Sequence, residues 1–285
     1  MDRFREATPE DGAAILALRA RCFGDVDPEK LDPRFQEWQF RNARAFVGER
    51  DGAIVTHVAF VRYGNLGLAI DAMSAPEARR GGLYSGLVAF AQDAIRDDFE
   101  LLYAFQIRKA VLGAMLRNGW SVAETIPVLV RPALLPVRAA GSVELLTRAS
   151  AAEMATLART RGFIEWRFFD NPHWRYRVAG ARDGAGRLVA WVVSRPTTLK
   201  GYATQAVVDV AFSDAQAARR LIRDAVAEGK RAGCTLIAAF VSRAHPARPL
   251  LLRSLFLPGP HRFRLLVLTP RQEPWRVTWA DTDHL

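Results

Sequence analysis

Cysteine is scarce in this sequence, and its two copies, Cys22 and Cys234, stand apart in apolar surroundings. Isolated cysteines form no disulfide framework, and we expect both to be reduced residues of the core. The five histidines are scattered and share no ligand spacing with the cysteines, so we expect no metal site. These absences argue against a disulfide-stapled protein and against zinc chemistry.

Long apolar runs and targeting segments are also missing. No stretch reaches the roughly 18 uninterrupted apolar residues of a membrane span. The first four residues lack the basic and then apolar pattern of a signal peptide. We therefore expect a cytoplasmic protein with no membrane span. The 285 residues, half of them apolar, suit two domains of about 140 residues with a core each.

Lysine contributes little to the net charge of +10, which is carried almost entirely by arginine. A basic protein can bind nucleic acid or an acidic surface. Here the arginines are spread over both halves, without a basic arm or a nucleic-acid motif, so we do not expect nucleic-acid binding. Arg108 and Lys109 could reach a phosphate or an acceptor, and solvent exposure is the alternative for both.

What is present is a glycine turn between two apolar segments. Residues 78–84 read Ala-Arg-Arg-Gly-Gly-Leu-Tyr and lie between an apolar stretch, residues 68–73, and an amphipathic one, residues 83–95. A strand, a glycine turn and a helix start make a phosphate site, because the backbone can approach an anion and unpaired N–H groups point at it. An ordinary strand-to-helix turn is the alternative.

The order of the predicted elements around this turn is more specific. Residues 8–11 predict a capped helix start, and Asp-Gly at residues 51–52 predicts a hairpin turn. The elements follow the order β-α-β-β-β-α-β-α-β over residues 1–132. Residues 79–84 also come close to the pattern [RQ]-x-x-G-x-[GA]. Pattern and order together resemble the GCN5-related N-acetyltransferase (GNAT) superfamily.

The second half of the chain is similar to the first. Four segments of the first half have a counterpart in the second half, in the same order. The opening strand and helix correspond to residues 143–161, residues 48–53 to residues 180–185, Asp71 to Asp209, and residues 101–108 to residues 236–243. Such recurrence indicates duplication of one unit. We therefore predict an α/β (α+β) fold of two tandem GNAT-like domains, each a mixed, mostly antiparallel sheet flanked by helices. The predicted domains are residues 1–135 and 142–285, divided where Pro and Gly break the periodicity.

The two halves differ at the glycine turn. Residues 218–222, Ala-Arg-Arg-Leu-Ile, stand in the second half where the first half has Ala-Arg-Arg-Gly-Gly. Leucine and isoleucine resist the backbone angles of glycine and fill the space that a phosphate needs. Ser213 and Asp214 instead predict a plain helix cap, with a helix that runs to Lys230 and ends near Gly233. We therefore expect a cofactor in the N-terminal domain alone. The second domain would build part of the acceptor site or act as a structural partner.

The resemblance implies transfer of an acyl group, most simply acetyl, from acetyl-coenzyme A to an amine by direct attack. It implies a cofactor loop made of Arg79, Arg80, Gly81, Gly82, Leu83 and Tyr84. It also implies that backbone groups of Ala72, Met73 and Ser74 lie at the thioester, on a strand that splays from its neighbour. Positioning and backbone donors can supply much of the acceleration.

The residues that would protonate the leaving thiolate depart from the family pattern. Met115 stands where many members have a helix tyrosine, and Arg108 stands near the place of a helix asparagine. Tyr84 and Tyr103 are the candidate substitutes. A packed aromatic residue is the alternative for each.

The candidate general bases are Asp71, Glu124 and His57. The recurrence of Asp71 as Asp209 favours a structural role for it, because the second half lacks the glycine turn. A buried, hydrogen-bonded histidine is the alternative for His57. A water chain to a distant carboxylate would also serve.

Two segments suggest an acceptor site. Residues 163–176 are the most aromatic stretch and include Trp166 and Arg167; they resemble a segment of tandem GNAT proteins associated with bacterial surface-polysaccharide synthesis. A helix packed into a core is the alternative. The tail carries Asp281 and Asp283, which could recognise an ammonium group, and a frayed acidic terminus is the alternative.

The leading hypothesis is an acetyl-CoA-dependent tandem GNAT enzyme that acts on a small-molecule amine, with an amino sugar or nucleotide sugar as first choice. A homodimer is the assembly considered. The second hypothesis is a tRNA-dependent aminoacyl-transferase of the peptidoglycan-bridge type, which the intact glycine turn argues against. The third is a non-catalytic acyl-CoA-binding protein, which the missing helix tyrosine makes credible.

Overall fold

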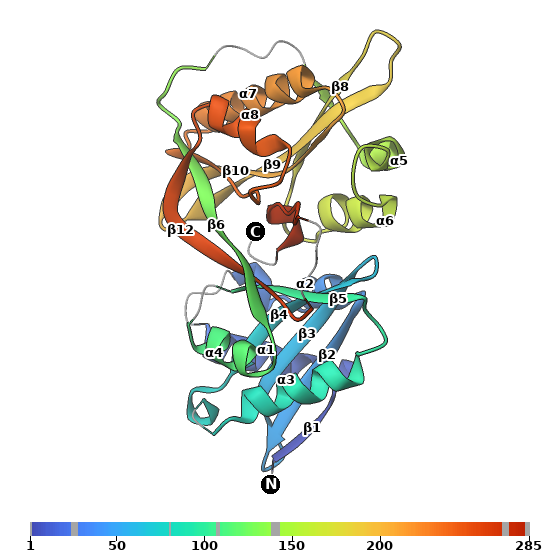
Figure 1. The fold of residues 1–285 in the computed structure, drawn as a ribbon, viewed down its shortest axis with the longest axis vertical. Helices are drawn as coiled ribbons and strands as arrows, with labels where there is room; N and C mark the ends of the chain where they lie inside the picture. The colour runs from blue at the N-terminus through green and yellow to red at the C-terminus, as the bar shows by residue number, and fades with distance from the viewer. Residues whose placement is uncertain are drawn as a thin grey trace. The chain divides into compact units, whose positions relative to one another are not determined.

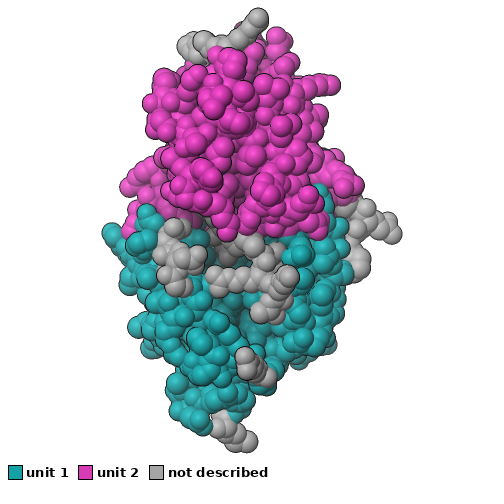
Figure 2. Space-filling model, turned by 90° about the vertical axis from the view of Figure 1, so that its left-hand side faces the viewer, with its two compact units in different colours: residues 1–124, 264–271 teal, residues 125–263, 272–285 magenta. Residues whose placement is uncertain are grey.

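The computed structural model describes residues 2–23, 28–79, 81–106, 109–137, 143–269 and 274–282 (Figure 1). The chain forms two compact units, which are coloured separately in Figure 2. The first unit contains residues 1–124 and 264–271, and the second contains residues 125–263 and 272–285. Among the described residues, no helix is long and apolar enough to cross a membrane.

The first unit follows the predicted order of elements, with one addition. Its elements are β1 (Asp2–Glu6), α1 (Gly12–Cys22), α2 (Pro33–Phe40), β2 (Ala43–Arg50), β3 (Ala53–Tyr63), β4 (Leu66–Ser74), α3 (Leu83–Ala94), β5 (Leu101–Gln106), α4 (Lys109–Arg117) and the start of β6 (Ser121–Pro132). The addition is α2, whose N-cap Asp32 accepts a hydrogen bond from Arg34 N at 2.8 Å. Before α1, the predicted capping box is present, with Thr8 N donating to Asp11 Oδ2 at 2.8 Å.

The sheet of the first unit has helices on both faces. Strands β1 to β5 pair in sequence order, antiparallel except for the parallel β4–β5 pair. One face packs α3 and α4 against a core that includes Phe46 and Phe60. The other face packs α1 against Val47 and Met73. Alternation along β2 sends Phe46 and Val47 to opposite faces, as period-2 strand geometry requires.

The second unit repeats this plan with a shorter opening. Its elements are the rest of β6, β7 (Glu144–Leu145), α5 (Ala151–Ala155), α6 (Arg161–Ile164), a π-helical turn (Glu165–Phe169), β8 (Arg177–Arg182), β9 (Leu188–Leu199), β10 (Tyr202–Phe212), α7 (Ala215–Arg231), β11 (Leu236–Ala239), α8 (Ala247–Arg253) and most of β12 (Leu257–Val267). The helix predicted near residues 150–161 therefore ends early, at Ala155, and a second short helix follows. Strands β8, β9 and β10 are antiparallel, and β10–β11 is parallel.

The division of the chain differs from the predicted boundary between residues 135 and 142. The last part of β6 pairs with β11, with Val130 opposite Ala238. The last part of β12 pairs with β5, with Leu266 opposite Ala104. Each unit thus contains a strand segment from the other half of the sequence. Strand pairing decides where backbone N–H and C=O groups find hydrogen-bond partners. The unit boundary therefore follows the strand pairing and not the proline- and glycine-containing stretch.

The segment predicted as a degenerate glycine turn lies inside a helix. Asp214 caps α7, and its Oδ1 accepts hydrogen bonds from Gln216 N at 2.7 Å and Ala217 N at 3.2 Å. Residues 218–222 are therefore helical, and Leu221 and Ile222 are buried in the core of the second unit. The link from β10 to α7 is residues 213–214, whereas the link from β4 to α3 is residues 75–82. The helix predicted to start at a Ser213–Asp214 cap and to run to Lys230 is confirmed, since α7 ends at Arg231. The match of residues 218–222 to the glycine turn was misplaced, because those residues lie within the helix.

Candidate functional site

A β-bulge interrupts β4 in the first unit. His57 on β3 lies opposite Met73, and Ala59 lies opposite Ile70, so Asp71 and Ala72 together face a single residue of β3. Asp71 has a φ of 50°, in the left-handed region that an aspartate adopts at some cost. A bulge leaves one residue out of the ladder and bends the strand. Backbone groups near Ala72 are therefore available to a ligand.

The side chain of Asp71 is taken up by an ion pair. Arg19 on α1 binds its carboxylate, and the two side chains are 2% and 9% exposed. The same guanidinium donates to Gln39 Oε1 at 3.0 Å. His57 Nδ1 lies 3.1 Å from the Asp71 carbonyl oxygen, which it reaches as a donor in the neutral tautomer with Nδ1–H. Burial lowers the pKa of His57, although Asp71 acts to raise it, so the ring is neutral near pH 7.

The glycine turn ends at the N-terminus of α3. Gly82 is the N-cap, with a φ of 73°, and its carbonyl accepts the first helical bond from Gly86 N at 3.0 Å. A side chain at Gly82 would meet none of the described atoms within 4 Å, so the space in front of this helix end is open. Arg79 Nε donates to Ser74 O at 3.1 Å, which fixes that arginine beside the end of β4. Arg80 lies outside the described residues.

One cavity, with a volume of about 420 Å³, brings the bulge and the helix end together. It is lined by Cys22, Phe23, Ala72, Met73, Ser74, Arg79, Gly82, Tyr84, Ser85, Val111, Ala114 and Arg117. Six of these were predicted from the sequence: Ala72, Met73, Ser74, Arg79, Gly82 and Tyr84. Predicted Gly81 and Leu83 do not line it, because Leu83 turns into the α1 core. Two parts of the lining were not predicted from the sequence, namely the end of α1 and the face of α4. The three-residue spacing along α4 is a signal that the sequence does carry.

Tyr84 presents a buried phenol oxygen. The atom has no hydrogen-bond partner among the described residues. Burial raises the pKa of Tyr84 above its usual range, so the group is a neutral O–H donor near neutral pH. A buried donor without a partner is costly, and a ligand that accepts its hydrogen bond would remove that cost.

The other catalytic candidates do not line this cavity. The Tyr103 ring is buried and lies 6.4 Å from Tyr63 and 6.0 Å from Phe105, centroid to centroid. Its β5 neighbours Leu102 and Ala104 belong to the α3 core, so alternation places Tyr103 on the opposite face. Glu124 is half-buried on β6, at the end of the first unit.

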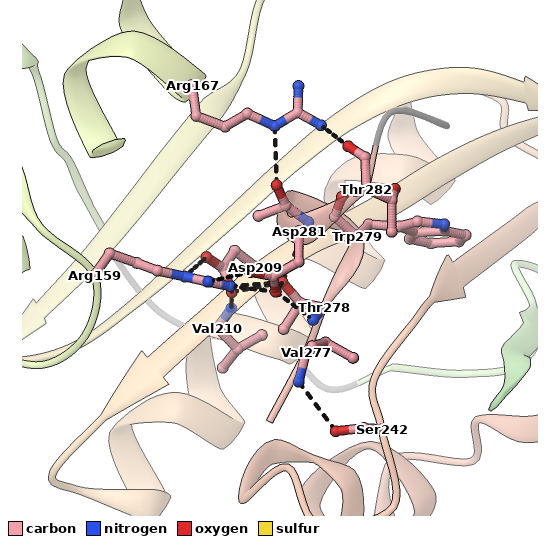
Figure 3. Close-up of polar contacts among 11 residues, drawn as sticks. Arg159, Arg167, Asp209, Val210, Ser242, Val277, Thr278, Trp279, Asp281 and Thr282 are labelled. Carbon is pink, nitrogen blue, oxygen red and sulfur yellow. Dashed lines mark hydrogen bonds and ion pairs between the residues drawn. The ribbon is translucent and has the colours of Figure 1, made fainter. Parts of the chain in front are cut away.

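A second buried charge cluster occurs in the second unit (Figure 3). Arg159 Nε donates to Asp209 Oδ2 at 3.0 Å, and Arg159 Nη2 donates to Asp281 Oδ2 at 2.7 Å. Thr278 Oγ1 donates to Asp209 Oδ1 at 2.9 Å. Burial acts to lower the pKa of Arg159, but the two carboxylates raise it well above the ordinary value. The predicted substrate residue Asp281 is thus engaged within its own unit.

The predicted substrate residues Trp166 and Arg167 are buried as well. Arg167 Nε donates to Ala280 O at 3.2 Å, and Nη2 donates to Thr282 O at 3.1 Å (Figure 3). Trp166 is 8% exposed. These contacts hold the C-terminal segment against the π-helical turn; the predicted contact with an acceptor stays a prediction. Asp283 lies outside the described residues.

Comparison with solved structures identifies the fold. A GCN5-related N-acetyltransferase from Anabaena variabilis superposes with a TM-score of 0.70 at 12% identity, over 94% of this chain and 72% of that one. The chain has the fold of the GCN5-related N-acetyltransferases. A tandem GNAT protein from the clavulanic acid biosynthesis pathway matches with a TM-score of 0.65 at 15% identity, over 95% and 100% of the chains. Saccharomyces cerevisiae N-myristoyltransferase with bound myristoyl-CoA matches with a TM-score of 0.66 at 11% identity, over 96% of this chain and 80% of that one.

The predicted fold class is confirmed, and the tandem neighbour supports the arrangement of two GNAT-like domains. A scan of protein-family models and a search of curated proteins returned no match to this sequence. At these identities the comparisons establish the GNAT fold, and activity is argued from the site itself.

Proposed function

We propose that the first unit binds acyl-coenzyme A, most simply acetyl-CoA, and that the protein transfers the acyl group to the amine of a small molecule. The observation that carries this proposal is the cavity that joins the β4 bulge to the N-terminus of α3. The bulge offers a backbone donor, the helix end offers an anion site, and the unpartnered phenol of Tyr84 also lines the cavity. We retain an amino sugar or nucleotide sugar as the first acceptor to test, and the cytoplasm as the expected location.

The residues present fit such a ligand. The open space in front of Gly82 and the free N–H groups of the first turn of α3 suit a diphosphate, which the helix dipole also favours. Arg79 adds positive charge at the same end of the cavity. Ala72, Met73 and Ser74 line the cavity on the bulged strand, where a linear, mostly apolar chain can run toward the bulge.

Acyl-coenzyme A, when bound, supplies an acyl group activated as a thioester. The backbone N–H of Ala72, at the bulge, would stabilise negative charge that develops on the carbonyl oxygen. Tyr84 would donate its phenol proton to the departing sulfur, because its raised pKa keeps it protonated. The ion pair with Arg19 occupies the Asp71 carboxylate, so we assign Asp71 to holding the bulge in place and not to removing the proton of the amine.

The engagement of Asp71 by Arg19 also favours a second candidate function, in which the protein binds acyl-CoA without turning it over. Among the described residues that line the cavity, none is a carboxylate or histidine that could act as a general base. Release of coenzyme A in the presence of a panel of small amines distinguishes the two candidates. Steeply salt-dependent binding of RNA would instead favour the tRNA-dependent alternative.

Calorimetric titration of acetyl-CoA into the wild-type protein and a Gly82→Ile variant tests the proposal. We expect micromolar binding that is lost in the variant, because isoleucine fills the space and resists a φ of 73°. Gly52→Ile is the matched control, since Gly52 has a φ of 79°, equally open surroundings and a place in the β2–β3 turn. Binding that survives Gly82→Ile would place the ligand elsewhere, and no wild-type binding would overturn the proposal.

A further inference from the structure

Helix α4 presents an arginine to the same cavity. Val111, Ala114 and Arg117 are spaced three residues apart and all line it, so one face of α4 forms a wall of the site. The first two make that wall apolar and narrow. Arg117 ends it with a guanidinium in the last turn of the helix.

The guanidinium is directed back along the helix. Its Nη1 lies 3.6 Å from the position that a Cβ would occupy on Gly113, one turn earlier. A side chain at that position would be in ordinary van der Waals contact with the guanidinium. Among the described residues, Arg117 has no hydrogen-bond or ion-pair partner. Arg79 and Arg117 are the charged residues that line the cavity, and none of the described residues that line it is acidic. A positive charge without a counter-ion is therefore available to a ligand.

Arg117 is also close to the anion site at the start of α3. The next residue, Asn118, donates from Nδ2 to Ser85 Oγ at 2.8 Å, and Ser85 belongs to the first turn of α3. This bond fixes the C-terminal end of α4 beside the N-terminal end of α3. The carbonyls at this end of α4 are already bonded within the chain: Ala114 O accepts from Asn118 Nδ2 at 2.9 Å, and Met115 O accepts from Asn118 N at 2.9 Å. Arg117 is therefore the charge that this end of α4 presents to the cavity.

We propose that Arg117 binds the diphosphate of coenzyme A from the side of α4, opposite Arg79 and the N-terminus of α3. This inference rests on the proposed function. A diphosphate carries two negative charges, and the site then offers it two guanidinium groups, from β4's end and from α4, with helix N–H groups between them. The glycine turn of residues 79–84 thus forms one part of the phosphate site, and α4 supplies the other part through Arg117.

The test compares the wild-type protein with Arg117→Gln and Arg117→Lys. The ligands are coenzyme A and 3′-dephospho-coenzyme A, which keeps the diphosphate and lacks the third phosphate; inorganic pyrophosphate serves as a competitor. Arg3→Gln is the matched control. Arg3 is exposed on β1, so this substitution removes the same charge at a place outside the cavity. Circular dichroism checks that each variant is folded.

We expect Arg117→Gln to weaken both ligands by the same factor, about tenfold, which is the size of one charge-assisted hydrogen bond. Pyrophosphate should compete less well in this variant, Arg117→Lys should recover part of the loss, and Arg3→Gln should bind as the wild type does. Equal binding by wild type and Arg117→Gln would overturn the inference while leaving the proposed function intact. A loss confined to coenzyme A would overturn it too, because Arg117 would then serve the 3′-phosphate. No binding of coenzyme A by the wild type would overturn both proposals.

Discussion

Asp71 and Asp209 occupy equivalent places in the two halves of the chain, and each carboxylate is bound by an arginine of its own unit. Asp71 lies in the bulge of β4 and pairs with Arg19. Asp209 lies where the register of β10 shifts against β9, and it pairs with Arg159. The second half has kept this ion pair although it has no glycine turn. The pair therefore serves the fold, by fixing an irregular strand, and does not depend on a ligand.

Breaking the pair in the first unit should destabilise it strongly. Asp71→Asn leaves the Arg19 charge buried with one fewer counter-charge, and we expect the free energy of unfolding to fall by about 3 kcal/mol. Urea denaturation measures the loss. Asp93→Asn is the control, because the Asp93–Arg96 pair is exposed and should contribute under about 0.5 kcal/mol. Equal effects of the two substitutions would contradict a structural role for the Asp71–Arg19 pair.

Tyr84→Phe should lower kcat by about 100-fold while changing the Kd for acyl-CoA far less, because the phenol is assigned to the departing sulfur. The raised pKa of Tyr84 also predicts the pH dependence of kcat. The phenol stays protonated above the pH at which an ordinary tyrosine ionises, so kcat should not fall in that pH range through loss of this proton. Steady-state kinetics over a pH series make both measurements. Tyr63→Phe, which removes a hydroxyl outside the cavity, should behave as wild type. An unchanged kcat in Tyr84→Phe would remove it as the acid.

Cys22 gives a chemical readout of cavity occupancy. Its thiol lines the cavity, and burial raises its pKa although Arg79 acts to lower it. Alkylation by iodoacetamide should therefore be slow near pH 7 and should keep rising with pH after an exposed cysteine has reached its plateau. Acyl-CoA should protect Cys22 and leave Cys234, in the other unit, unprotected. Mass spectrometry of the two peptides checks this, and equal rates with and without ligand would count against the site.

Leu255 is held in an unfavourable conformation at the end of α8. Its φ is 66°, it is 53% exposed, and the turn is closed by Phe256 N donating to Leu251 O at 3.1 Å. Helices that end in this way usually have glycine at that position. We expect Leu255→Gly to raise the free energy of unfolding by about 1 kcal/mol, because glycine adopts positive φ without strain.

Leu257 provides the control for this substitution. It is also exposed, at 63%, but it lies in the extended strand β12, where glycine weakens the structure. Leu257→Gly should therefore lower stability, and urea denaturation of both variants should give changes of opposite sign. Loss of stability in both would show that the Leu255 side chain makes a contact worth more than the strain.

The sequence by itself determined the features that depend on neighbours within a few residues. The capping box of Thr8 and Asp11, the β2–β3 turn with Gly52 at a φ of 79° and the left-handed Gly82 at the start of α3 are all present. Each is a local choice of backbone angle or hydrogen bond, which side-chain chemistry alone can make. The element order, and with it the GNAT-like fold, followed from these signals.

The tertiary structure decided everything that joins distant segments. Strand β12 pairs with β5 and β6 pairs with β11, which moved the unit boundary away from the proline-rich stretch. Arg19 reaches Asp71, Arg159 reaches Asp281, and Arg117 joins the cavity of the glycine turn. No spacing in the sequence encodes such meetings, because they depend on which strands pair and on which face of a helix packs inward. The candidate site was therefore half visible in the motif, and its α4 wall and its ion pair appeared only when the chain was folded.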